Sequence, residues 1–177
     1  MFGDSLSAAY GIAQSRGWVA LLGERLKRER LDYSVVNASV SGETTAGGAA
    51  RLNPALDKHR PSVVIIELGG NDGLRGMPVA AMKKNLSGMI EQSRKSGARV
   101  LLVGMRMPPN YGPQYTSEFE RAFSELAKQY NTALVPFLFE DLGVRRDYFQ
   151  PDGIHPTEAA QPVMLETIWK RLKPLLK

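Results

Sequence analysis

The sequence of 177 residues contains no cysteine and only two histidines. The absence of cysteine excludes disulfide bonds, a catalytic thiolate and cysteine-ligated zinc. If one histidine is used for catalysis, a single histidine remains, which is too few ligands for a transition-metal site. No cofactor is therefore implied. The longest apolar runs, such as Val100–Val103 and Thr132–Leu138, fall far short of the roughly 20 residues that a membrane-spanning helix requires. We therefore expect no stable membrane insertion.

Charge of either sign is modest, and the positive excess is spread along the chain. The 23 Lys and Arg against 18 Asp and Glu give a formal net charge of +5. The one basic run, over residues 25–30, is typical of a solvated helix face; weak attraction to anionic head groups or to coenzyme A phosphates stays open. Because stacking aromatics and clustered basic residues are missing, we expect no nucleic-acid partner.

Short apolar stretches alternate with helical patterns along the whole length. With 43% hydrophobic and 23% charged residues and no linker or repeat, residues 1–177 are expected to form a single domain. Strands are expected near Tyr33–Ala38, Ser62–Leu68, Arg99–Met105 and Thr132–Pro136. Strands that are apolar throughout are typical of a parallel sheet covered on both faces. The sequence therefore predicts an α/β fold: a three-layer αβα sandwich with a flavodoxin-like parallel central sheet.

Apolar residues at helical spacing predict the helices between these strands. We expect helices around Trp18–Leu26 and Met82–Ile90. A third helix is expected to begin at a capping box over Ser117–Glu120, and a last one to run over about Thr157–Arg171.

Two short motifs at opposite ends of the chain contain the residue types that activate a serine as a nucleophile. Residues 3–7 read Gly-Asp-Ser-Leu-Ser, and residues 152–155 read Asp-Gly-Ile-His. A serine hydroxyl is a useful nucleophile at neutral pH only when a neutral imidazole takes its proton and a carboxylate orients that imidazole. Ser5 is therefore the candidate nucleophile.

The candidate base is one of two histidines. His59 lies in a segment typical of the solvated end of a helix, whereas His155 lies in a segment stiffened by a proline on either side. Gly153 can adopt unusual backbone angles, which lets the Asp152 carboxylate fold back toward His155 Nδ1. An isolated Asp-x-x-His pair often only caps a turn, but beside the Ser5 motif it predicts Ser5, Asp152 and His155 as catalytic residues.

Two further segments supply groups that can bind an oxyanion. Gly42 can present an unobstructed backbone N–H, and Asn71 can offer its side-chain NH₂; with the Ser5 amide they make three donors of a predicted oxyanion hole. All three residues lie just past an expected strand, where open α/β sheets bind ligands. Each also has a structural alternative, because Asp4 and Ser5 can cap a helix and the other two can belong to plain turns.

In this order and context, Ser5, Gly42, Asn71 and His155 resemble the four blocks of the SGNH (GDSL) hydrolase superfamily. The resemblance covers nearly the whole chain. The nucleophile elbow of ordinary α/β-hydrolases, Gly-x-Ser-x-Gly, is not met, since residue 7 is serine. We also expect a helix to begin after Ser5 and to add a favourable dipole there.

Three segments are most similar to the bacterial arylesterase and multifunctional thioesterase/lysophospholipase branch: Gly69–Gly76, Pro109–Gly112 and Asp152–Pro156. The resemblance implies a serine esterase that acts through an acyl-enzyme on small-molecule aryl esters, short to medium acyl esters and thioesters. It also implies a periplasmic or secreted protein. The oligomeric state stays open.

Two loops rich in glycine and proline, residues 73–78 and 106–115, can wall an apolar acyl or aryl groove. The alternative is that their side chains merely pack the loops down. The residues expected to contact substrate are Gly70, Leu74, Met77, Met107 and Tyr111.

Other activities of the same fold stay open. A carbohydrate acetylesterase favours polar loops, which these are not, whereas an acyltransferase differs only in the acceptor of the acyl group. A non-catalytic acyl-binding module is suggested by one departure from the family pattern. Only Met1 and Phe2 precede Gly3, so we expect most of a central first strand to be missing. A gap is then expected beside the nucleophile, unless residues upstream of Met1 are absent from this sequence, which we favour, or another segment fills it.

Overall fold

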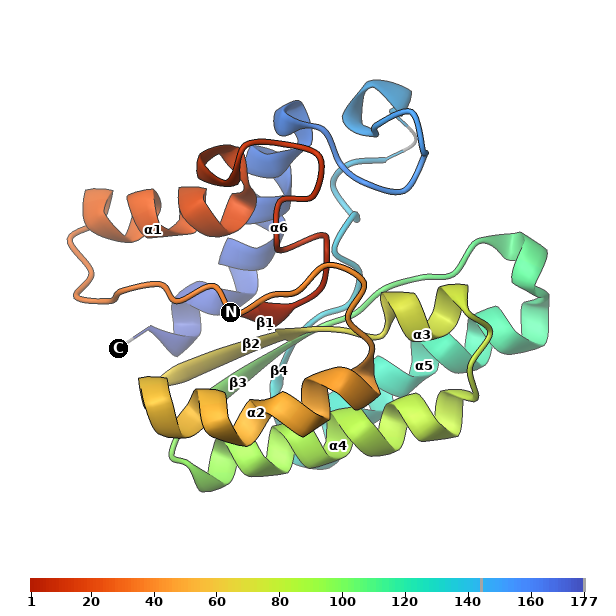
Figure 1. Cartoon of the computed structure of the whole chain (residues 1–177), viewed down its shortest axis with the longest axis horizontal. Coiled ribbons are helices and arrows are strands. Elements are labelled where there is room, and N and C mark those ends of the chain that lie inside the picture. Colours follow the sequence, from red (N-terminus) through yellow and green to blue (C-terminus); the bar gives the residue numbers. More distant parts are fainter. Residues whose placement is uncertain (144, 177) are drawn as a thin grey trace.

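The computed structural model describes residues 1–143 and 145–176. Its centre is one sheet of parallel strands in the order β1-β2-β3-β4 (Figure 1). The strands are β1 (Phe2–Gly3), β2 (Val63–Glu67), β3 (Arg99–Val103) and β4 (Ala133–Val135). The predicted α/β class and parallel sheet are confirmed, and β2 to β4 fall inside three of the predicted strands.

Helices cover both faces of the sheet (Figure 1). The helices are α1 (Trp18–Arg28), α2 (Thr45–His59), α3 (Gly70–Leu74), α4 (Val79–Lys95), α5 (Pro113–Tyr130) and α6 (Gln161–Leu172). One buried cluster joins α2, α4 and α5 to the sheet, and the other joins α1 and α6. In the described ranges no helix is long and apolar enough to cross a bilayer.

Neighbouring residues of the central strands point to opposite faces of the sheet. Ile66 and Leu102 belong to the cluster under α2, α4 and α5, whereas Ile65 and Leu101 belong to the cluster under α1 and α6. This period of two is the side-chain alternation of a β-strand. Because both faces are covered, both sets are apolar, which explains the unbroken apolar runs in the sequence.

The predicted strand over Tyr33–Ala38 is wrong. This segment lies alongside β1 without being a strand of the sheet. The amide of Ala38 donates to the carbonyl of Met1 at 2.9 Å, and the amide of Val40 donates to that of Gly3 at 3.0 Å. Because β1 has only two residues, it offers too short a partner for a full ladder.

The expected gap does not lie beside the nucleophile. The register of β1 on β2 pairs Phe2 with Ile66 and Gly3 with Glu67, so the backbone just before Ser5 is paired. A cavity of about 620 Å³ lies instead at the amino ends of the strands, where its lining includes Met1, Tyr33, Pro61 and Val63. The part of β2 that is not paired with β1 therefore lies at the amino end of the strand, whereas Ser5 lies beyond the carboxyl ends.

Two expectations about helices are also wrong. Helix α5 begins at Pro113 rather than at Ser117, because Gly112, with φ of 87°, turns the chain and proline suits the first helical position. Residues 5–11 form turns, and Ala9 there has a positive φ of 60°. Within the described part of the chain no helix begins directly after Ser5, so the expected helix dipole is not supplied there.

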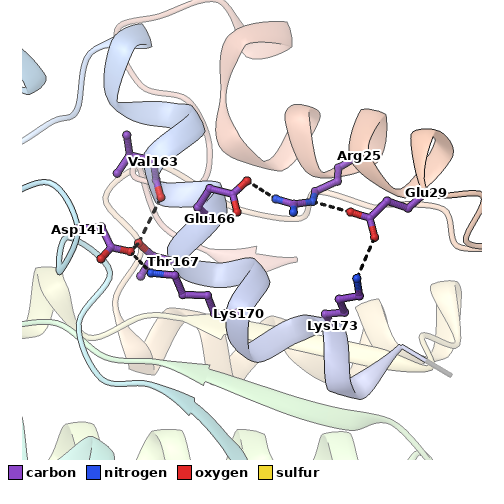
Figure 2. A network of polar contacts seen from close by, with 8 residues as sticks. All are labelled: Arg25, Glu29, Asp141, Val163, Glu166, Thr167, Lys170 and Lys173. Carbon is purple, nitrogen blue, oxygen red and sulfur yellow. Dashed lines mark hydrogen bonds and ion pairs between the residues drawn. The ribbon is translucent and has the colours of Figure 1, made fainter.

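Polar contacts join α1 to α6 on the outside of the sheet (Figure 2). Arg25 on α1 donates to Glu29 at 3.0 Å and to Glu166 on α6, and Lys173 lies 3.4 Å from Glu29. The Arg25 guanidinium also stacks 4.2 Å from the centre of the Trp169 ring. Since the Arg25 side chain is only 14% exposed, these contacts are partly shielded from water.

Replacing Arg25 with alanine should lower the free energy of unfolding by about 1–2 kcal/mol, because both ion pairs, the stacking on Trp169 and packing of the aliphatic stem are lost. Urea denaturation followed by circular dichroism measures the change. The control is Arg16→Ala, whose side chain is 65% exposed and pairs with Glu158; it should cost less than about 0.5 kcal/mol. Equal losses in the two variants would contradict this role for Arg25.

Candidate active site

Ser5, His155 and Asp152 form one continuous chain of hydrogen bonds. His155 Nε2 lies 2.9 Å from Ser5 Oγ, and His155 Nδ1 lies 2.7 Å from Asp152 Oδ2. Asp152 Oδ1 accepts the amides of Ile154 and His155, each at 2.9 Å. These bonds, led by the His155 amide and then its ring, lower the pKa of Asp152 to about 2. An ionised carboxylate at Nδ1 keeps the imidazole hydrogen there, so Nε2 is free to accept the Ser5 proton.

The local fold brings together turns that are 150 residues apart. Gly153, with φ of 69°, lets its segment turn back, and the amide of Gln150 closes the turn by donating to the carbonyl of His155 at 2.7 Å. Gln150 Nε2 then donates to the carbonyl of Tyr10 at 2.9 Å. The Tyr10 ring lies 4.4 Å from the His155 ring, centre to centre. Gln150 and Tyr10 are missing from the predicted site, and no sequence pattern marks them.

The three predicted oxyanion donors lie on segments that the structure joins. Gly42 has φ of 78°, and a side chain added there would meet nothing within 4 Å. Among the described residues, the amides of Ser5 and Gly42 have no acceptor. Asn71 Nδ2 donates to Asp4 Oδ2 at 3.1 Å and to the carbonyl of Glu43 at 3.0 Å. Both Asn71 hydrogens are thus engaged, so donation to an oxyanion requires one of these bonds to be shared.

Two buried carboxyl groups near the nucleophile were not predicted. Burial raises the pKa of Asp4 to about 6. Burial, and then the charge of Asp4, raise the pKa of Glu67 well above its usual range. The sequence carries one signal of this pair, because Glu67 ends an otherwise apolar strand.

A buried polar network fixes the position of α3 against α2. Asp72 is 1% exposed, and its carboxylate accepts the Thr45 amide at 2.9 Å and the Thr45 hydroxyl at 2.5 Å. Asn85 Nδ2 donates to the same hydroxyl at 3.1 Å. Since Asp72 follows Asn71 and Thr45 begins α2 just after the Gly42 loop, the network holds together the two segments that carry predicted oxyanion donors.

The variant Asp72→Ala should lower the free energy of unfolding by about 2–4 kcal/mol, because it leaves the buried amide and hydroxyl of Thr45 without an acceptor. It should also lower the kcat of ester hydrolysis. The matched control is Asp57→Ala, which removes an exposed carboxylate from α2 and should change stability by less than about 0.5 kcal/mol. Denaturation midpoints measure the stability of both variants. An Asp72→Ala protein as stable as the wild type would contradict this role for Asp72.

The two predicted substrate loops lie against each other. The hydroxyl of Tyr111 donates to the carbonyl of Leu74 at 2.8 Å, and that of Tyr115 donates to the carbonyl of Met77 at 2.7 Å. Leu74 is exposed at 37%, so its side chain is available to a ligand. These two hydrogen bonds hold the loops against each other.

Two of the predicted substrate residues lie deeper than expected. Met107 is buried in the core cluster and lies over Gly73, where even a Cβ atom would collide with it. Its side chain fills the space that Gly73 leaves and is not exposed to a ligand. Gly70 is also buried, and a Cβ atom there would lie 3.5 Å from Asp4 Oδ2. Both residues are therefore packed inside the protein and not exposed to a ligand.

Curated relatives match the chain over almost its full length. Esterase TesA of Pseudomonas aeruginosa is 55% identical over 98% of this chain and 87% of its own length. An arylesterase of Vibrio mimicus is 41% identical, covering 97% of this chain and 86% of that protein. Thioesterase 1/protease 1/lysophospholipase L1 of Escherichia coli K12 is 40% identical, covering 99% and 83%.

A solved structure and a family model agree with these relatives. The psychrotrophic esterase EstA from Pseudoalteromonas sp., in a form inhibited by monoethylphosphonate, superposes with a TM-score of 0.94 at 40% identity, covering 99% of this chain and 96% of that one. Residues 1–162 match the model of the GDSL-like lipase/acylhydrolase family. The chain therefore belongs to this family, the SGNH (GDSL) hydrolases, and is a carboxylic ester hydrolase.

Proposed function

We propose that the chain is a serine esterase that hydrolyses aryl esters, short to medium acyl esters and thioesters through an acyl-enzyme on Ser5. The observation that carries this proposal is the unbroken chain of hydrogen bonds from Ser5 Oγ through His155 to Asp152. This arrangement supplies a nucleophile, a base and a group that orients the base.

In the first step, Ser5 Oγ attacks the carbonyl carbon while His155 Nε2 takes the hydroxyl proton. The amides of Ser5 and Gly42 face the oxyanion, and Asn71 shares one of its two side-chain hydrogens with it. The protonated His155 then gives its proton to the leaving alcohol or thiol, which leaves an ester on Ser5. Water attacks that ester as His155 takes its proton, and the acid departs as Ser5 regains its hydrogen.

The names of the relatives support the proposed substrates, because they include an arylesterase and a thioesterase/lysophospholipase. We place the acyl or aryl group against the wall made by Leu74, Met77 and Tyr111. Met107 and Gly70 are packed inside the protein and are not part of this wall. By family resemblance we also propose a periplasmic or secreted location.

The proposed function is tested by steady-state hydrolysis of para-nitrophenyl esters of increasing acyl length, with acyl-coenzyme A thioesters alongside. We expect turnover to peak at one chain length, which measures the groove. Product analysis in the presence of an added alcohol separates hydrolysis from acyl transfer, and acetylated sugars test the carbohydrate alternative. A folded chain that binds these esters without turning any of them over contradicts the proposal and favours a binding module.

A further inference from the structure

Two buried carboxyl groups hold the turn that carries Ser5. Asp4 and Glu67 are only 2% and 3% exposed. The hydroxyl of Ser7 donates to Glu67 Oε2 at 2.7 Å, and the amide of Asp4 approaches the same oxygen at 3.4 Å. The amide of Leu6 donates to Asp4 Oδ1 at 3.0 Å. Residues on both sides of Ser5 are thus bonded to this pair.

The backbone passes very close to Glu67. A Cβ atom at Gly3 would lie 2.8 Å from Glu67 Oε2 and 3.0 Å from the Glu67 carbonyl oxygen. Only glycine lets the strand before Ser5 run so near the carboxyl group. The contact of the nucleophile turn with Glu67 is therefore built into the backbone as well as into side chains.

The two carboxyl groups share one buried site, because Glu67 Oε2 lies 3.4 Å from the amide of Asp4 and the two residues are only 2% and 3% exposed. Two carboxyl groups in one buried site do not both ionise, because each negative charge disfavours the other. One of the two therefore keeps its proton at neutral pH.

The hydrogen-bond donors around each carboxyl group indicate which of the two holds the proton. Both carboxyl oxygens of Asp4 accept a hydrogen bond, Oδ1 from the Leu6 amide and Oδ2 from Asn71 Nδ2, whereas the donors that the described residues offer to Glu67 both lie at Oε2. These contacts favour an ionised Asp4. The charge that acts on Glu67 is that of Asp4, which disfavours a second negative charge there.

We propose that Glu67 is a positioning residue that keeps its proton at neutral pH and donates it to the Asp4 carboxylate, leaving one negative charge beneath Ser5. This charge orients Asn71, because a carboxylate attracts the amide nitrogen at 3.1 Å rather than the amide oxygen. The neutral Glu67 holds Ser7 and the nucleophile turn. The effect on rate rests on the proposed esterase function, but the location of the proton does not.

Three variants separate charge from shape. Glu67→Leu removes both hydrogen-bonding atoms and should lower kcat by about 10- to 100-fold with little change in KM, because Ser5 loses its position. Glu67→Gln keeps a neutral acceptor for Ser7 and a donor for Asp4, so it should restore kcat to within about threefold of the wild type. Asp4→Asn should move the acid limb of the pH–rate profile to lower pH, because the His155 imidazolium loses a nearby negative charge. Glu67→Gln should leave that limb in place.

Infrared spectroscopy detects the protonated carboxyl group independently of enzymatic activity. At neutral pH the wild type should show the carbonyl stretch of a protonated carboxylic acid, and the difference spectrum against Glu67→Gln should show that band lost. The absence of the band overturns the proposal, and so does a folded Glu67→Gln that loses as much kcat as Glu67→Leu or shifts the acid limb. A wild type that shows the band but hydrolyses no ester leaves the proton on Glu67 and refutes the proposed function instead.

Discussion

Replacing Ser5 with alanine should lower kcat for para-nitrophenyl esters by about a thousandfold or more. The structure gives the reason, because His155 Nε2 has the Ser5 hydroxyl as its partner at 2.9 Å. Without that oxygen no acyl-enzyme can form, and only water activated by His155 remains. Substrate binding through the loops does not depend on Ser5, so KM should change little. Steady-state kinetics at saturating ester measure both constants.

The matched control removes a hydroxyl elsewhere. Ser117 is exposed on α5, and Ser117→Ala should keep kcat within about twofold of the wild type. Circular dichroism shows whether Ser5→Ala is folded. A folded Ser5→Ala that retains most of its activity would show that another residue is the nucleophile.

The second large effect is expected for Asp152→Asn, with kcat falling by about 10²- to 10⁴-fold. An asparagine oxygen can still accept the amides of Ile154 and His155, so the turn keeps its shape. Its NH₂ group can occupy the place of Oδ2, which lies 2.7 Å from His155 Nδ1. A donor there favours the wrong imidazole tautomer and does not stabilise the imidazolium. The loss should therefore appear in kcat rather than in folding.

The control for Asp152→Asn is Asp147→Asn. Asp147 is 61% exposed and pairs with Arg145, outside the chain of bonds to Ser5, so its replacement should leave kcat unchanged. Stability gives a second readout with a defined sign. Because the pKa of Asp152 is lowered from 3.8 to about 2, its contribution to stability is present above pH 3.8 and is lost as the pH falls through about 2. An Asp152→Asn enzyme as fast as the wild type would contradict the assigned role.

Local patterns in the sequence were enough to predict much of the fold. The apolar runs at Val63–Glu67 and Arg99–Val103 predict central strands because both faces of the sheet are covered. The pairing of Asp152 with His155 was also predictable, because only two residues, one of them glycine, lie between the two and keep their side chains within reach. The contact of His155 with Ser5, which are 150 positions apart, leaves no local pattern, so it could be inferred only from the chemistry that a serine nucleophile needs and from the resemblance.

Features that depend on long-range contacts could not be predicted. The segment Tyr33–Ala38 has the composition of a strand, but its partner β1 has only two residues. Met107 is apolar and lies in a predicted groove loop, yet its side chain packs in the core over Gly73, where there is no side chain to block it. The bond between Glu67 and Ser7 joins residues 60 positions apart and leaves no pattern in either segment.

The role of Ser5 as nucleophile is tested most directly by covalent trapping. The wild type is treated with diethyl para-nitrophenyl phosphate, and peptides are mapped by mass spectrometry as ester hydrolysis is lost. One diethylphosphoryl group on Ser5, formed in step with inactivation and absent from Ser5→Ala, is the predicted result. Inactivation with the group on any other residue, or an active enzyme that stays unmodified at full exposure, would contradict the proposed acyl-enzyme.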